Sequence, residues 1–171
     1  MENRYTAAVI TVSDKGSRGE RVDTSGPALV ELLTAAGYDV VKTGIVPDDF
    51  DAIRDALLEC ADELKVCLAL TTGGTGFSRR DITPEVTLSL VEKETRGIPE
   101  AMRYASLQIT PRACLSREAA GIRGETLIIN LPGSKKASTE NLSAVLPSLK
   151  HGIDILRGYD SDCGEEHHHH G

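Results

Sequence analysis

Residues 66–76, VCLALTTGGTG, are the stretch of this sequence that decides its fold. The stretch begins as a continuous apolar run, which is typical of a strand buried on both faces of a sheet. Two threonines and a glycine-rich turn follow at once. Glycine lets the main chain turn tightly and approach a ligand without hindrance from a Cβ atom. The stretch therefore predicts a central strand whose carboxyl end carries a loop able to contact a ligand.

Outward from this strand, strand-like and helix-like stretches alternate along the chain. Strands are also expected at 6–13, 38–46 and about 126–131. Helices are expected at 27–37, 47–64, 83–93, 99–107 and 134–156. Pro147 predicts a kink in the last helix. This alternation predicts a layered α/β fold with a mostly parallel sheet, in which ligands bind beyond the carboxyl ends of the strands.

The 171 residues are expected to form one domain over 1–158, followed by a disordered acidic and His-rich tail over 159–171. With no Trp, two Phe and four Tyr, the core must be mainly aliphatic. The residues do not decide whether the four histidines of the tail are native or a tag remnant. Three cysteines, Cys60, Cys67 and Cys114, are interpreted as small apolar residues in a reducing cytoplasm.

Charge and hydropathy exclude several classes of partner. The net charge of −7 argues against nucleic acid as a partner. No apolar run approaches the roughly 18 residues of a membrane span, and the first residues do not resemble a secretory signal. The segment from Arg96 to Lys136, however, contains seven basic and only three acidic residues. This segment is either a zone for a small anionic ligand or an ordinary solvated surface.

Histidine usage narrows the chemistry further. His151 is the one histidine outside the tail, and it falls in a helical stretch near the end of the domain. A Ser-His-Asp or Cys-His mechanism would have to use this residue. A zinc site would need grouped His or Cys ligands, and the sequence has none outside the tail. An enzymatic reaction here would depend on carboxylates, hydroxyls and backbone amides, with or without a hard cation.

Several loops that follow strands carry residues suited to an anionic ligand. The glycine-rich loop continues as FSRRD and ends in Asp81, and neither standard nucleotide fingerprint, GxxxxGK[ST] or GxGxxG opening into a helix, is present. Asp48 follows the second strand, where capping of the next helix is a strong alternative. Thr83 is expected to cap the helix after Asp81. The NLPG turn at 130–133 leads into a helix start suited to phosphate.

Two carboxylates near glycine-loop amides and basic side chains fit magnesium-assisted phosphoryl or nucleotidyl transfer. Magnesium takes few protein carboxylates and leaves its other positions to phosphate and water. Such reactions depend on positioning and charge neutralisation more than on a proton-transferring histidine. The scarcity of histidine is therefore compatible with this class of reaction.

Three stretches together resemble the molybdopterin-binding MogA/MoaB family, which includes bacterial molybdopterin adenylyltransferase and the gephyrin amino-terminal domain. They are TTGGTGFSRRDITPE, LSREAAGIRGETLIINLPGSKKA and ITVSDKGSRGERVDTSGPAL. The similarity extends from about Ala7 to Ile155 in the same order. The His-rich tail is not expected in that family.

The resemblance implies a three-layer α/β sandwich that assembles as a homotrimer. It also implies a cytoplasmic enzyme that transfers AMP from ATP to molybdopterin with Mg²⁺ and releases pyrophosphate, beside other molybdenum cofactor biosynthesis proteins. Asp48 and Asp81 correspond to the residues tied to catalysis and to the metal; Asp48 is preferred over Asp49 because it directly follows the proline. The expected nucleotide- and pterin-binding residues are Ser13, Asp14, Thr72, Gly73, Gly74, Thr75, Gly76, Arg79, Arg80, Leu131, Pro132, Gly133, Ser134 and Lys135.

Two other functions stay open at this point. One is a non-catalytic trimeric module of the MoaB type that binds molybdopterin or serves as a scaffold, since fold alone does not settle function. The other is insertion of molybdate into the pterin, which a related domain performs in longer proteins. The short length of the chain disfavours the second alternative.

Overall fold

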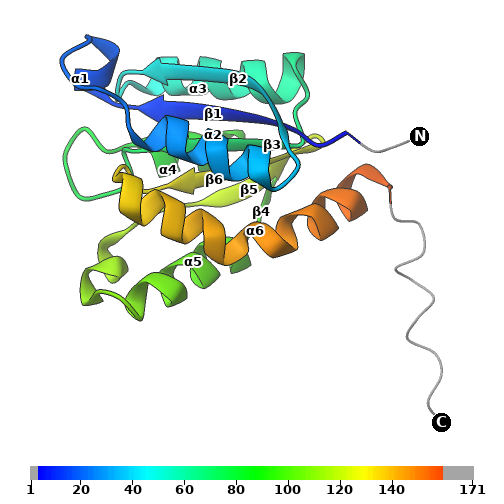
Figure 1. Ribbon diagram of the computed structural model, residues 1–171. Helices are drawn as coiled ribbons and strands as arrows, with labels where there is room; N and C mark the ends of the chain where they lie inside the picture. Colours follow the sequence, from blue (N-terminus) through cyan, green and yellow to red (C-terminus); the bar gives the residue numbers. More distant parts are fainter. Residues whose placement is uncertain (1–3, 160–171) are drawn as a thin grey trace.

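The structure is a computed structural model, and it describes residues 4–159. In this part of the chain a six-stranded sheet lies between two layers of helices (Figure 1). The strands are β1 (Thr6–Val12), β2 (Asp39–Val46), β3 (Leu68–Thr72), β4 (Lys93–Glu94), β5 (Ala120–Arg123) and β6 (Thr126–Leu131). The α-helices are α1 (Asp14–Ser17), α2 (Ser25–Ala35), α3 (Phe50–Leu58), α4 (Thr83–Leu90), α5 (Gly97–Leu107) and α6 (Lys135–Arg157).

The strand order is β2-β1-β3-β6-β5-β4, and it confirms the predicted α/β sandwich with a mostly parallel sheet. The four strands expected from sequence are mutually parallel and lie side by side. The two that were not expected, β4 and β5, are antiparallel and complete one edge. They are only two and four residues long, so they carry too little alternation of apolar residues to be recognised.

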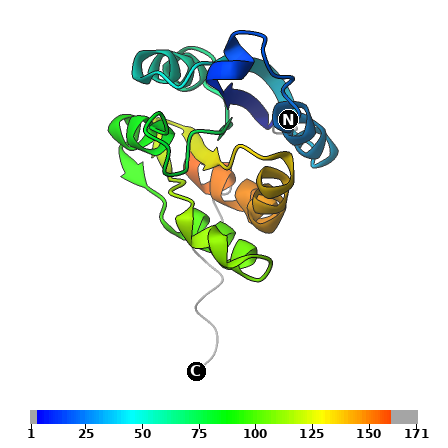
Figure 2. The ribbon, with the colours of Figure 1, turned by 90° about the vertical axis from the view of Figure 1, so that its left-hand side faces the viewer.

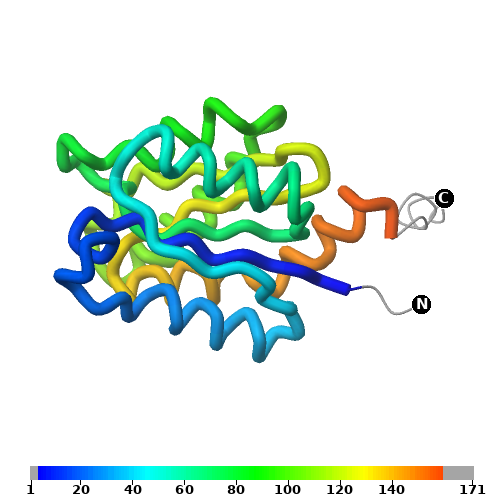
Figure 3. The backbone as a smooth tube through the Cα atoms, turned by 90° about the horizontal axis from the view of Figure 1, so that it is seen from above, coloured from blue at the N-terminus to red at the C-terminus, as the bar shows by residue number. Residues whose placement is uncertain are grey.

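Alternate residues of the central strands supply two separate cores. Ala7, Val9, Leu68 and Leu70 face the layer of α2, α5 and α6. Their neighbours Ala8, Ile10 and Ala69 face α3 and α4 on the other side. Figure 3 shows the strands running between the two helical layers. Because all five residues of β3 are buried, the continuous apolar run at 66–72 is explained by burial on both faces.

The helices differ from expectation mainly at their ends. α3 ends at Leu58 and continues as a π-helical turn, η1 (Glu59–Glu63). α4 ends at Leu90, short of residue 93, because Val91 is extended and Lys93 already pairs with β5. α6 contains Pro147, and Figure 1 shows this helix changing direction part-way along, as a proline in a helix interior predicts.

The cysteines confirm one expectation and correct another. Cys60 and Cys67 are buried, and burial raises the pKa of the Cys60 thiol to about 11. Cys114 was expected to be buried too, but it is exposed, because the 3₁₀ turn η2 (Pro111–Leu115) turns Ala113 inward instead. Cys163 and nearly all of the predicted tail lie outside the described residues. Among those described, no helix combines the length and hydropathy needed to cross a membrane.

Candidate active site

The carboxyl ends of β1, β3 and β6 meet at one edge of the sheet. Gly73 directly follows β3, and its N–H donates to the Leu131 carbonyl at the end of β6 (3.0 Å). Its φ is +109°, and a Cβ atom there would lie 2.2 Å from the Val12 carbonyl oxygen at the end of β1. Thr72 Oγ1 donates to the Pro132 carbonyl (2.7 Å). Figure 2 views the molecule from this end, which the sequence predicted as the ligand-binding edge.

Gly74 brings the main chain against Asp48, one of the two residues expected to be catalytic, and against Thr83. Its φ is +70°, and a Cβ atom there would lie 2.3 Å from Thr83 Oγ1 and 3.0 Å from Asp48 Oδ1. Thr83 was expected to cap α4, but the structure corrects this: Ile82 is the N-cap residue, and no side chain caps the helix. The Thr83 hydroxyl is instead buried beside the loop, with no hydrogen-bond partner among the described residues.

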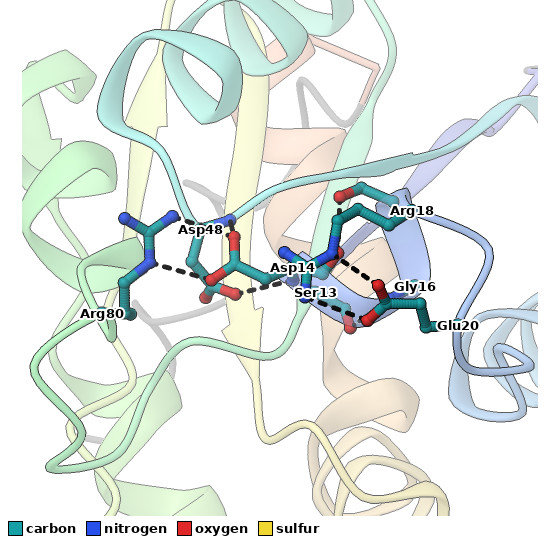
Figure 4. Close-up of polar contacts among 8 residues, drawn as sticks. Ser13, Asp14, Gly16, Arg18, Glu20, Asp48 and Arg80 are labelled. Carbon is teal, nitrogen blue, oxygen red and sulfur yellow. Dashed lines mark hydrogen bonds and ion pairs between the residues drawn. The ribbon is translucent and has the colours of Figure 1, made fainter.

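The carboxylates of Asp14 and Asp48 each accept a hydrogen bond from the backbone N–H of the other residue (Figure 4). The Asp14 N–H donates to Asp48 Oδ2 and the Asp48 N–H donates to Asp14 Oδ1, both at 3.0 Å. Arg80 reaches across from the glycine-rich segment and donates through Nε and Nη2 to the two oxygens of Asp14 (2.8 and 2.9 Å). Segments separated by more than 30 residues are thus tied into one charged cluster.

The two aspartates of this cluster differ in their ionisation. Burial is the main cause that raises the pKa of Asp48, and the nearby Asp14 and Asp81 carboxylates add to it. The Arg80 guanidinium is the main cause that lowers the pKa of Asp14. A partly desolvated carboxylate next to other acids attracts a cation more strongly than an exposed carboxylate does.

The structure also separates Asp48 from its neighbour Asp49. The helix cap of α3 is Asp49, whose Oδ2 accepts from the Ala52 N–H (3.0 Å). The capping alternative for Asp48 is therefore wrong, and the Asp48 side chain is free to face the cavity. Asp81 lines the same cavity, and its Oδ2 accepts from the Ser78 N–H (3.0 Å). Asp48 and Asp81 thus line one cavity, as expected from the sequence.

This cavity has a volume of about 400 Å³ and lies at the meeting point of the strand ends. Six of the residues expected to bind nucleotide or pterin line it together with the two acids: Ser13, Thr72, Gly73, Gly74, Gly133 and Ser134. Ser134 also caps α6, where its Oγ accepts from the Ala137 N–H (3.1 Å). Backbone N–H groups at a helix start favour an anionic group.

Other expected residues lie around the cavity without lining it. Asp14 and Arg80 belong to the charged cluster described above, and Leu131 is fully buried with its carbonyl bonded to Gly73. Gly76 and Pro132 offer backbone carbonyls to neighbouring side chains. Thr75 is buried, whereas Arg79 and Lys135 are exposed to solvent.

Sequence analysis missed a second wall of the cavity, the loop before α2. Asp23 accepts from Thr11 Oγ1 (2.7 Å) and from the Gly26 N–H (3.0 Å), and Ser25 lies between them. Arg21 and Val22 belong to the same wall. The signal was the VDTSG segment, in which an acid, two hydroxyls and a glycine span the start of a helix. Only the return of this loop over β1 makes it part of the site.

Three of the five arginines of the 96–136 segment bond the protein itself rather than facing the cavity. Arg103 donates to the Ser116 and Glu118 carbonyls, and Arg123 bonds the Leu90 carbonyl and Asp62. Arg96 pairs with Glu94. These side chains hold the protein's own segments together. His151 is exposed on α6 and belongs to no part of the cavity.

The donor set fits magnesium better than a transition metal. Within residues 4–159 no group of three or more His, Cys, Asp or Glu side chains could enclose a metal ion. Two carboxylates on one open cavity, with room for phosphate oxygens and water, match the way magnesium is bound in nucleotide sites.

Comparison with known proteins agrees with this geometry. Residues 8–151 match a family described as a probable molybdopterin binding domain. The chain belongs to this molybdopterin-binding family. The molybdopterin adenylyltransferase of Helicobacter pylori is 42% identical over 152 residues, which cover 88% of this chain and 86% of that protein. The family expected from the three sequence stretches is thereby confirmed.

Two further members of the family frame the alternatives. A crystal structure of the molybdopterin biosynthesis enzyme MoaB from a Thermus species superposes with a TM-score of 0.86 at 46% identity, covering 90% of this chain and 97% of that one. The gephyrin of Dictyostelium discoideum is 41% identical over 98% of this chain, which spans only 24% of gephyrin's length. Relatives with different names and different lengths thus share this domain.

Proposed function

We propose that this chain is a molybdopterin adenylyltransferase that transfers AMP from ATP to molybdopterin. The observation that carries the proposal is that Asp48 and Asp81 line one cavity together with Gly73 and Gly74 of the glycine loop. Relatives over most of the chain are named for this activity. The cavity offers negative charge for a cation and main-chain N–H groups for phosphate, which are the two requirements of nucleotidyl transfer.

In this reaction a terminal phosphate oxygen of the pterin attacks the α-phosphorus of ATP. The new bond joins that oxygen to the α-phosphorus, while the bond from the α-phosphorus to the bridging oxygen breaks and pyrophosphate leaves with its electrons. The attacking phosphate is already ionised at neutral pH, so no histidine base is needed. The task of the protein is to align the two phosphates and to balance their charge.

Each group has a role in that alignment. Asp48 and Asp81 would hold Mg²⁺, which when bound neutralises charge on the triphosphate. Amides of the loop at 74–76 and of the α6 start at Ser134 would hold phosphate oxygens. Arg80 would exchange its bond to Asp14 for a phosphate of the bound nucleotide, and Arg79 and Lys135 would add positive charge at the rim. Asp23 and Ser25 would contact the pterin from the opposite wall.

Release of pyrophosphate on mixing ATP, Mg²⁺ and molybdopterin tests this proposal. Asp81→Asn and Asp48→Asn should each lower the turnover number by about 10²-fold or more, because each removes a charge that the transition state requires. Asp49→Asn is the matched control: it changes the adjacent aspartate, which caps α3, and should keep wild-type turnover. Wild-type turnover in a folded Asp81→Asn protein would overturn the assignment.

The alternative is a non-catalytic module of the MoaB type that binds molybdopterin or acts as a scaffold. The MoaB to which this chain is similar is itself described as a biosynthesis enzyme, so the similarity does not decide between the two. In the alternative case molybdopterin would bind at the cavity, and ATP would yield no pyrophosphate. The same assay, combined with calorimetric titration of molybdopterin, separates the two functions. Both acids and the complete glycine-rich segment are present, which favours the enzyme.

The homotrimer, the cytoplasmic location and contact with other molybdenum cofactor biosynthesis proteins are further parts of the proposal. They rest on the family resemblance. The domain is proposed to end near residue 158, where Gly158 closes α6 in a left-handed conformation.

A further inference from the structure

Arg117 lies outside the cavity but is bonded to the segment that carries Asp81. Its Nε donates to the Gly76 carbonyl (2.8 Å) and its Nη2 donates to the Asp81 carbonyl (2.9 Å). Its Nη1 pairs with the carboxylate of Glu85 in the first turn of α4. Its own N–H donates to the Thr75 carbonyl (2.9 Å). One side chain thus contacts both ends of the loop between the glycines and α4.

The residues between these two ends bond one another, as when Asp81 Oδ2 accepts from the Ser78 N–H, but have few contacts that reach beyond the loop. Residues 77–80 are exposed, and 72% of the Phe77 surface is open to solvent. The one ion pair from this stretch, Arg80 to Asp14, involves an arginine side chain that is 61% exposed. Exposed ion pairs contribute little to conformational stability. Among the contacts that reach beyond the loop, the bond from Arg117 to the Asp81 carbonyl is therefore the main one that fixes the position of Asp81.

The main chain on both sides of Arg117 is bonded by a second arginine. Arg103 on α5 donates through Nη1 to the carbonyls of Ser116 and Glu118, the residues on either side of Arg117 (both 3.2 Å). The guanidinium of Arg117 is planar and offers donors in a fixed fork, so it can bond two carbonyls and a carboxylate at once. A lysine offers one ammonium and cannot span these acceptors.

We propose that Arg117 is a positioning residue, whose guanidinium sets the place of the Asp81 carboxylate by fixing the Gly76 and Asp81 carbonyls. The kinetic part of this inference rests on the proposed adenylyl transfer; the conformational part does not. Arg117 contacts no expected substrate position, so its loss should affect the alignment of reacting groups more than the binding of the pterin.

The kinetic test compares Arg117→Ala and Arg117→Lys with wild type in the pyrophosphate assay. Both variants should lose turnover by about 10²-fold, with the KM for molybdopterin changed less than about threefold, because small misplacement of a reacting group costs this much. Millimolar guanidinium should restore at least about fivefold of the activity of Arg117→Ala and should not stimulate wild type. Turnover of Arg117→Lys equal to wild type would overturn the proposal.

Arg123→Ala is the matched control. Arg123 is the last residue of β5, the strand that follows Arg117, and its side chain is 30% exposed against 34% for Arg117. It bonds one carbonyl and one carboxylate. It lies at the opposite end of β5, away from the cavity. If Arg117 served only general stability, both alanine variants would lose turnover in proportion to their unfolded fraction.

Limited trypsin digestion tests the conformational part without any substrate. Arg79 and Arg80 are cleavage sites inside the tethered loop. Cleavage there, identified by mass spectrometry, should be at least about tenfold faster in Arg117→Ala and Arg117→Lys than in wild type and Arg123→Ala at equal folded fraction. Equal rates in all four proteins would overturn the inference. An inactive wild type would refute the proposed function and leave this digestion result to decide on Arg117.

Discussion

At the scale of single residues, Asp48 combines a partly buried charge with a place in the proposed catalytic cavity. Burial raises its pKa, so its ionisation costs the folded protein free energy that the unfolded chain does not lose. This contribution makes the wild type lose stability as pH rises from about 4 through the raised pKa. The lowered pKa of Asp14 acts in the opposite sense, since its contribution to stability is lost as pH falls.

We therefore expect Asp48→Asn to be more stable than wild type at pH 7, by roughly 1 kcal/mol or about 2–4 °C in Tm. The asparagine oxygen can still accept from the Asp14 N–H. The difference should shrink as pH falls toward about 4, the ordinary pKa of an Asp side chain in the unfolded chain, and vanish only below it. Thermal unfolding followed by circular dichroism between pH 4 and 8 measures this, and a variant less stable than wild type at pH 7 would contradict it.

Gly74 gives a second prediction at this scale. In Gly74→Ala the new Cβ atom would meet Thr83 Oγ1 and Asp48 Oδ1, so the loop must shift in addition to bearing the cost of a positive φ. We expect a loss of about 2–3 kcal/mol in unfolding free energy and no detectable ATP binding.

Gly124→Ala serves as the control for backbone conformation. Gly124 also has a positive φ, +58°, but nothing lies within 4 Å of its Cβ position. This variant should lose only about 1 kcal/mol and keep full binding. Urea unfolding and calorimetric titration with ATP compare the two, and equal losses in both would show that contact with Thr83 and Asp48 does not matter.

At the scale of elements, Asn130 ties β6 to three neighbours. Its Nδ2 donates to Thr71 Oγ1 on β3 (3.0 Å) and to Thr87 Oγ1 on α4 (2.8 Å). Its Oδ1 accepts from the Ala119 N–H beside β5 (3.2 Å). These bonds are buried, so they fix how the strands that carry the glycine loop and the LPG turn lie against α4.

Asn130→Ala should lower the free energy of unfolding by about 3 kcal/mol, because it removes three buried hydrogen bonds and leaves their partners unsatisfied. Gln108→Ala, which removes an exposed amide bonded to the Tyr104 carbonyl, should change it by less than about 0.5 kcal/mol. Urea denaturation of both variants measures the two values. A loss below 1 kcal/mol for Asn130→Ala would mean that packing alone aligns these elements.

At the scale of the whole molecule, the proposed assembly is open to direct measurement. We expect sedimentation velocity at micromolar concentration to give about three times the chain's 18.3 kDa. Exposed apolar side chains on α5 and in the η2 region, Tyr104, Leu107, Ile109 and Leu115, are surface that an assembly could cover. A species of one chain mass at this concentration would contradict the trimer and leave the cavity within a single chain unaffected.

The sequence by itself determined the layered fold, the four parallel strands and the edge of the sheet at which the cavity lies. These features follow from local patterns, such as the continuous apolar run at 66–72 and the glycines after it. An apolar run indicates burial, and glycines indicate a close approach of the main chain to its neighbours. It also favoured Asp48 and Asp81, because acids that follow strands must meet at one edge of a parallel sheet.

Tertiary structure alone decided which local role each polar residue has. Asp49 rather than Asp48 caps α3, no side chain caps α4, and Asp23 belongs to the cavity wall. Arg117, in a segment that suggested a surface for anions, bonds the glycine loop instead. The physical reason is that a cap, an ion pair and a ligand contact use the same side-chain types. Only the approach of distant segments in space selects among these roles.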